Sequence, residues 1–154
     1  ASAGNDGLFG CGTVDNPLAI YAEAYSVGAV DTTGQLANFS SLGPVTVDGS
    51  GRVKPDIAAP GEGVLSTFPG STYASNSGTS MAGPHVVGVV ALMWSANPAL
   101  RGNIDLTQQI LDQTAKPHQG GLPSCVKSGT MPNNAYGYGI VDAYAAVKAA
   151  MELR

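Results

Sequence analysis

Charged residues, cysteines and long apolar runs are all scarce in this chain of 154 residues. Asp, Glu, Lys and Arg make up only 12% of it, the net charge is −4, and there is no basic run, so we expect no nucleic-acid partner. No stretch has the pattern of a signal peptide, a transit peptide or a transmembrane span. The two cysteines, Cys11 and Cys125, show no CxxC or Cys/His spacing, which argues against zinc and leaves either two free thiols or one disulfide.

The remaining composition is that of a globular domain. A hydrophobic content of 44% and a length of 154 residues are enough to bury one sizeable core. The 21 glycines and 10 prolines indicate many turns. We find no internal repeat and no linker, so residues 1–154 are expected to belong to one domain.

The stretch Gly78–His85 has the features of a nucleophile site. Ser80 follows a Gly and a Thr, which suit a tight entry into a helix. The first N–H groups of a helix are unpaired and its dipole favours negative charge there, which is what a developing oxyanion needs. The same three residues also occur at simple helix caps. Residues 86–94 are apolar on every side, which predicts a buried helix.

The octapeptide Gly-Thr-Ser-Met-Ala-Gly-Pro-His at Gly78–His85 closely resembles the nucleophile motif of the subtilisin-like serine peptidases, the subtilases. The resemblance implies an α/β fold with a mostly parallel sheet and a buried central helix that carries Ser80 as the nucleophile. It also implies a Ser-His-Asp triad and hydrolysis of peptide bonds through an acyl-enzyme. Further segments resemble family motifs in the same order along nearly the whole chain: Ala3–Asn5, Val27–Val30, Phe39–Pro44, Lys54–Gly61 and Tyr136–Ala143.

The resemblance also assigns roles around the nucleophile. Asn5, by itself a typical turn residue, would donate its side-chain amide to the oxyanion beside the backbone N–H of Ser80. Residues 7–17 would form one wall of the pocket for the substrate side chain before the scissile bond. An extended polypeptide substrate would lie near the strand edge at 1–4. The implied substrate-binding residues are Ala1, Ser2, Ala3, Gly4, Ser77, Gly78 and Thr79.

The triad Asp and His motifs of the family do not occur in this sequence. Residues 1–154 are therefore expected to be the C-terminal half of one catalytic domain, with its N-terminal half, or a second copy across an open sheet edge, as partner. A different class remains as the alternative, a non-catalytic binding or scaffold domain derived from a subtilase. An unrelated α/β hydrolase ranks last, because Gly-x-Ser-x-Gly is absent around Ser80.

No residue of the chain is an obvious replacement for the missing base. His85 follows Ser80 by five positions, roughly 140° around a helix, so its ring cannot reach the Ser80 oxygen. In the family the matching His is structural. A Ser-Glu-Asp site, as in the related sedolisins, would need acidic residues that the sequence does not place. Nothing directs the other candidates to Ser80; they are His118, Lys54, Lys116, Lys127 and Lys148.

Three expectations follow from the family as a whole. A secreted or extracellular location and an even cysteine count imply a Cys11–Cys125 disulfide. No metal or cofactor site is expected in this chain. Calcium is often used by the family and is expected, if at all, in the full-length enzyme; Asp56 could contribute, although we favour a buried capping role for it.

Two helices are expected after the nucleophile helix. Asp105 and Gln108 form a capping-box-like start for one that runs to about Thr114. Asp142 is the expected N-cap of the last. Its buried face should contain Ala143, Val147, Ala150 and Met151.

Overall fold

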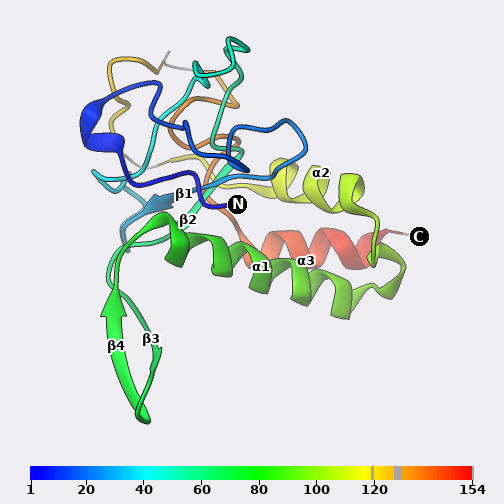
Figure 1. Ribbon diagram of the computed structural model, residues 1–154. Helices are drawn as coiled ribbons and strands as arrows, with labels where there is room; N and C mark the ends of the chain where they lie inside the picture. Colours follow the sequence, from blue (N-terminus) through cyan, green and yellow to red (C-terminus); the bar gives the residue numbers. More distant parts are fainter. Residues whose placement is uncertain (119, 127–129, 154) are drawn as a thin grey trace.

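The structure is a computed structural model that describes residues 1–118, 120–126 and 130–153. Helices and strands are mixed, in agreement with an α/β fold (Figure 1). The strands are β1 (Val27–Val30), β2 (Ile57–Pro60), β3 (Val64–Phe68) and β4 (Thr72–Asn76). The α-helices are α1 (Thr79–Ala96), α2 (Ile104–Thr114) and α3 (Ala143–Glu152), with 3-10 turns η1 (Gly7–Phe9) and η2 (Pro98–Leu100).

A parallel sheet lies at the centre. β1 pairs with β2 in parallel, in a register that joins Val27 to Ile57. Parallel bridges continue the sheet on both sides, from Ser2 to Val27 and from Ala58 to Ile140. All four residues of β1 are buried, as its continuous apolar sequence predicts for a strand covered on both faces. β3 and β4 form a separate sheet, an antiparallel hairpin.

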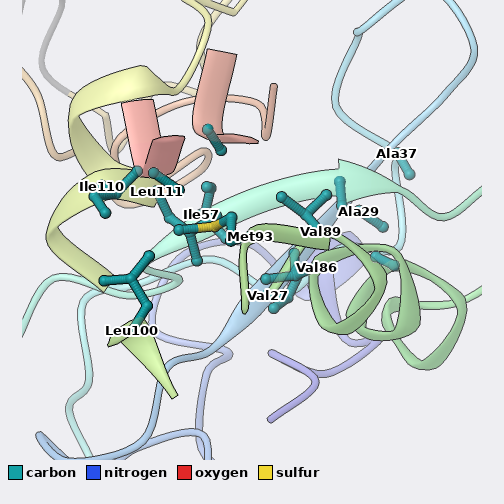
Figure 2. Close-up of a cluster of buried hydrophobic side chains, with 14 residues drawn as sticks. Val27, Ala29, Ala37, Ile57, Val86, Val89, Met93, Leu100, Ile110 and Leu111 are labelled. Atoms are coloured by element: carbon teal, nitrogen blue, oxygen red, sulfur yellow. The ribbon is translucent and has the colours of Figure 1, made fainter. Parts of the chain in front are cut away.

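Helix α1 packs on this sheet through one apolar face. Val86, Val89 and Met93 recur at helical spacing and are all buried. Met93 has no exposed surface and lies beside Ile57 of β2 and Leu111 of α2 (Figure 2). Full burial of such a side chain contributes about 1.5–3 kcal/mol, so this face fixes the helix, and with it Ser80, on the sheet.

The prediction that residues 86–94 are buried on every side is wrong for the described chain. Val87 and Leu92 on the outer face of α1 are 68% and 55% exposed. The reason is geometric, since the elements that contact α1 (β1, β2, α2, α3 and η2) cover only one side of it. The apolar outer face has no cover within residues 1–118, 120–126 and 130–153.

Helix starts agree with the sequence at one site and differ at another. Asp142 caps α3 as predicted, because its carboxylate accepts the N–H of Ala145 at 3.0 Å. The cap of α2 is Asn103, which accepts the N–H of Leu106 at 3.2 Å, and not Asp105. Asp105 lies inside the first turn, where a carboxylate still interacts favourably with the helix dipole.

The buried face of α3 was predicted only in part. Ala146 and Ala150 are fully buried, whereas Met151 is 65% exposed and Ala143 is also exposed. Alanines four residues apart share one face and carry little bulk, so α3 can approach α1 closely through them. The larger side chain then remains at the surface.

An internal ion pair anchors the start of β1. The ammonium of Lys54, of which 1% is exposed, donates to the carboxylate of Asp56 at 2.7 Å and to the carbonyl of Ala24 at 2.5 Å. The same carboxylate oxygen accepts the backbone N–H and the hydroxyl of Ser26 at 2.6 and 2.9 Å. Asp56 therefore caps this turn, and its carboxylate already has a cationic partner.

Replacing Lys54 by Met should lower the free energy of unfolding by about 3 kcal/mol, because it leaves the Asp56 charge without its partner. We take the low end of the range since Asp56 is 23% exposed. Urea unfolding of the protein measures the loss. The double variant K54M/D56N should lose less than the sum of the two single variants, and additive losses would contradict the proposed coupling.

Cys11 and Cys125 are joined by a disulfide with a Cα–Cα distance of 6.0 Å. The bridge ties residues 7–17, which follow Asn5, to the loop that joins α2 to α3. It closes a separation of 114 residues, and chain entropy can then contribute about 5 kcal/mol to stability.

Candidate active site at the start of helix α1

Ser80 lies in the first turn of α1 with its side chain exposed. The turn is held by the backbone, because the N–H of Gly78 donates to Gly61 at 2.8 Å and the N–H of Met81 donates to Gly78 at 2.9 Å. N–H groups at this end of a helix carry the positive end of the dipole. The local sequence thus places a hydroxyl beside a region of positive potential.

Asn5 is held against the same turn by Thr79. The side-chain oxygen of Asn5 accepts the backbone N–H of Thr79 at 2.8 Å and its hydroxyl at 3.0 Å. The Thr79 hydroxyl also lies 3.2 Å from the N–H of Gly4. Because the oxygen end of the Asn5 amide is anchored, its NH₂ end is the end left to serve as a donor.

Thr79 itself is fully buried, and its side chain contacts Gly4 and Asn5. The sequence resemblance included it among the substrate-binding residues, together with Ser77 and Gly78. In the structure Ser77 is exposed and its hydroxyl accepts the N–H of Gly63 at 2.9 Å, whereas Gly78 is buried. The Thr79 side chain therefore holds Asn5 in position.

Residues 1–4 run alongside β1. The N–H of Ala3 donates to Val27 at 3.0 Å, and the N–H of Val27 donates to Ala1 at 2.8 Å. Ala3 is fully buried, while Ala1 is exposed and Ser2 and Gly4 are half-buried. The strand-like backbone expected at this segment is therefore present.

Ser41 is a positioning residue that the sequence alone did not identify. Its N–H donates to Gly4 at 3.0 Å, and its hydroxyl accepts the N–H of Asp6 at 3.0 Å. A Cβ at Gly4 would lie 2.7 Å from the Ser41 hydroxyl, so this contact requires glycine. The Phe39–Pro44 motif was the available signal, but the motif did not reveal its contact with residues 4–6.

The alternative bases have other partners. The Nδ1 of His85 lies 2.9 Å from the carbonyl of Met81, and His118 stacks on Tyr136 with ring centroids 4.7 Å apart. Each lysine that the structure describes is in an ion pair: Lys54 with Asp56, Lys116 with Asp142, and Lys148 with Glu152. Lys127 lies outside the described residues.

An apolar groove of about 570 Å³ lies on the side of α1 that faces α2 and residues 1–2. Side chains from three segments form its walls, and they include Val27, Val86, Val90, Trp94, Ile104 and Leu111. Tyr25 also lines it and donates to Asp112 at 2.6 Å. Burial raises the pKa of Tyr25, so the phenol stays protonated and keeps this hydrogen bond.

Met81 should be the oxidation-sensitive residue of the site. It follows Ser80, and its sulfur would lie 3.7 Å from a Cβ placed on Gly78. A sulfoxide adds a polar oxygen to this crowded turn, so we expect peroxide to reduce peptide hydrolysis by the full-length enzyme and Met81→Ala to protect it. Met151→Ala is the matched control, because Met151 is 65% exposed on α3, away from Ser80. Equal sensitivity of the Met81 variant and the parent would place the damage elsewhere.

Comparison with known proteins agrees with the motif and the geometry. A model of the subtilase family matches residues 1–139, and the chain belongs to this family. It is similar to bacillopeptidase F of Bacillus subtilis, with 44% identity over 153 residues that cover 96% of this chain and 10% of that protein. M-protease of Shouchella clausii is 40% identical over 148 residues (96% and 32%). Subtilisin Savinase of Lederbergia lenta is 38% identical over 153 residues (96% and 45%). The chain thus spans less than half the length of each of these relatives.

Two further findings concern the described residues only. None of their helices is long and apolar enough to cross a membrane. In residues 1–118, 120–126 and 130–153 there is no group of three or more His, Cys, Asp or Glu side chains that could hold a metal ion.

Proposed function

We propose that residues 1–154 are the nucleophile-bearing part of a serine endopeptidase. The observation that carries the proposal is the anchored amide of Asn5, which is brought from 74 residues away to the turn that presents Ser80. The two bonds from Thr79 hold the side-chain oxygen of Asn5 and leave its NH₂ group as a donor beside this turn.

The reaction is acyl transfer. The Ser80 oxygen attacks the carbonyl carbon of a peptide bond, and the Asn5 amide and the Ser80 N–H donate to the oxygen that becomes negative. The amine leaves with a proton, and water then hydrolyses the acyl-enzyme. Polypeptides are the substrate class, bound in extended form along Ala1–Gly4.

The proton of Ser80 needs a base, which the described residues do not supply near it. We propose that the Asp and His of the triad come from the N-terminal half of the same catalytic domain. The relatives contain at least twice the length that this chain matches, which leaves room for such a segment. A second copy that pairs across an open sheet edge is the alternative partner.

The same half would cover the apolar surface of α1. Val87 and Leu92 are exposed, and the groove lined by Val90 and Trp94 is open. Water contact with this surface is unfavourable by roughly 25 cal/mol per Å² of apolar area, which favours a packed partner. We further propose secretion, in keeping with the disulfide, and calcium binding through residues of the N-terminal half.

The test uses the full-length enzyme, a fluorophosphonate probe and a peptide substrate. We expect labelling at Ser80 and peptide hydrolysis, with both lost in Ser80→Ala. Labelling or turnover that survives in Ser80→Ala would refute the assignment of the nucleophile. A folded full-length protein with neither activity would favour the scaffold alternative.

A further inference from the structure

The hairpin of β3 and β4, residues 64–76, forms an arm that extends away from the rest of the molecule (Figure 1). Its two strands pair only with each other in the described chain. Leu65, Phe68 and Tyr73 on this arm are 66%, 59% and 71% exposed. No charged residue occurs between positions 63 and 79. The arm is therefore uncharged, carries three large apolar side chains and is almost fully in contact with solvent.

The rest of the described chain covers little of this arm, so tertiary packing contributes little to its stability. A two-stranded hairpin by itself is marginally stable in water, and exposed large apolar side chains mark interaction sites. Leu65 and Tyr73 share one face, since they belong to the register pairs Leu65–Ser75 and Thr67–Tyr73, and Phe68 lies on the other. An added strand would alternate its own side chains between these two faces, so apolar residues on both faces suit strand addition better than packing of one face.

The base of the arm is fixed next to Ser80. The N–H of Gly63 donates to the Ser77 hydroxyl at 2.9 Å, and the N–H of Gly78 donates to Gly61 at 2.8 Å. β4 ends at Asn76, only four positions before Ser80. On its other side, this turn contacts Gly4 and Asn5 through Thr79.

We propose that the arm is a docking surface for the part of the polypeptide substrate that follows the scissile bond. A chain whose earlier residues lie along Ala1–Gly4 crosses Ser80 and continues toward the base of the arm. It adds as an extended strand to the outer edge of the hairpin and contacts Leu65, Phe68 and Tyr73. The preferred segment is uncharged and carries apolar side chains. This inference rests on the proposed function and adds to it the recognition of the leaving segment.

The experiment compares two substrates of the full-length enzyme. Both have the same residues before the scissile bond; one ends in a small chromogenic leaving group, and the other continues with six uncharged, partly apolar residues. In L65S/F68S/Y73S we expect kcat/KM for the long substrate to fall about tenfold, mainly through KM, and to stay within twofold for the short one. The matched control is Y144S/M151S, which removes apolar side chains that are 79% and 65% exposed on α3.

A second variant tests the contact by gain of function. Phe68→Lys should shift the preference toward long substrates with Glu in the segment after the scissile bond, because the new charge needs a partner. Binding of the long peptide to Ser80→Ala, with and without the arm substitutions, gives the same comparison without turnover.

Equal losses on both substrates, or no loss on either, would overturn the proposal. A change in molecular mass in solution with unchanged rates would assign the arm to a second copy instead. If the parent does not cleave even the short substrate, the proposed function fails independently of the arm.

Discussion

Residues 1–154 expressed alone will not work as a peptidase. The Ser80 hydroxyl is a weak nucleophile at neutral pH without a base, and the described histidines and lysines are engaged elsewhere. In a subtilisin, loss of the triad histidine costs about 2 × 10⁶ in kcat, and we expect a loss of this order here. Substrate binding will not compensate, because the part of the cleft that we assign to the N-terminal half is absent.

The measurement is incubation of residues 1–154 with a fluorophosphonate probe and a peptide substrate, beside the full-length enzyme and Ser80→Ala. Addition of the N-terminal half in trans should restore labelling of Ser80. It should also slow the exchange of the backbone amide hydrogens in the segments that line the apolar groove of α1. Rapid labelling of the isolated chain would mean that it contains a base that we have overlooked. A full-length enzyme as slow as the fragment would instead contradict the role of the N-terminal half.

Replacing Asn5 by Ala should lower kcat about 10²–10³-fold with little change in KM. We take this magnitude from the loss of one oxyanion donor in a subtilisin. The Asn5 amide would meet the substrate oxygen only as the carbonyl becomes tetrahedral, and such an interaction acts on the transition state alone. Steady-state kinetics of the full-length enzyme measures both constants.

Asn5 also anchors Thr79, so a second variant separates donation from positioning. In Asn5→Asp one oxygen can still accept the two bonds from Thr79, but the NH₂ donor is gone and a negative charge faces the oxyanion. We expect Asn5→Asp to lose at least as much kcat as Asn5→Ala. Gln109→Ala is the control, because it removes a side-chain amide that is exposed on α2, outside the site. Activity of Asn5→Asp close to the parent would assign Asn5 to the turn alone.

The features that the sequence determined by itself are local. Ser80 at the start of a helix and Asp142 as the cap of α3 each depend on hydrogen bonds within a few residues, so the residue types there are sufficient to predict them. The motif at Gly78–His85 also identified the family, which the comparison with known subtilases confirms. Family motifs fall at such places because the chemistry of a turn leaves little choice of residue.

The tertiary structure alone decided the features that join distant segments. Thr79 is buried against Asn5, and the Asp56 carboxylate pairs with Lys54 and accepts hydrogen bonds from Ser26. Helix α1 is covered on one side only. The sequence did not predict that β3 and β4 pair as an arm that projects into solvent. Whether an apolar side chain is buried depends on which segments lie beside it, and that depends on the path of the whole chain. A run such as Val86–Trp94 indicates a helix that can be buried, but only its neighbours in the fold determine which of its faces are covered.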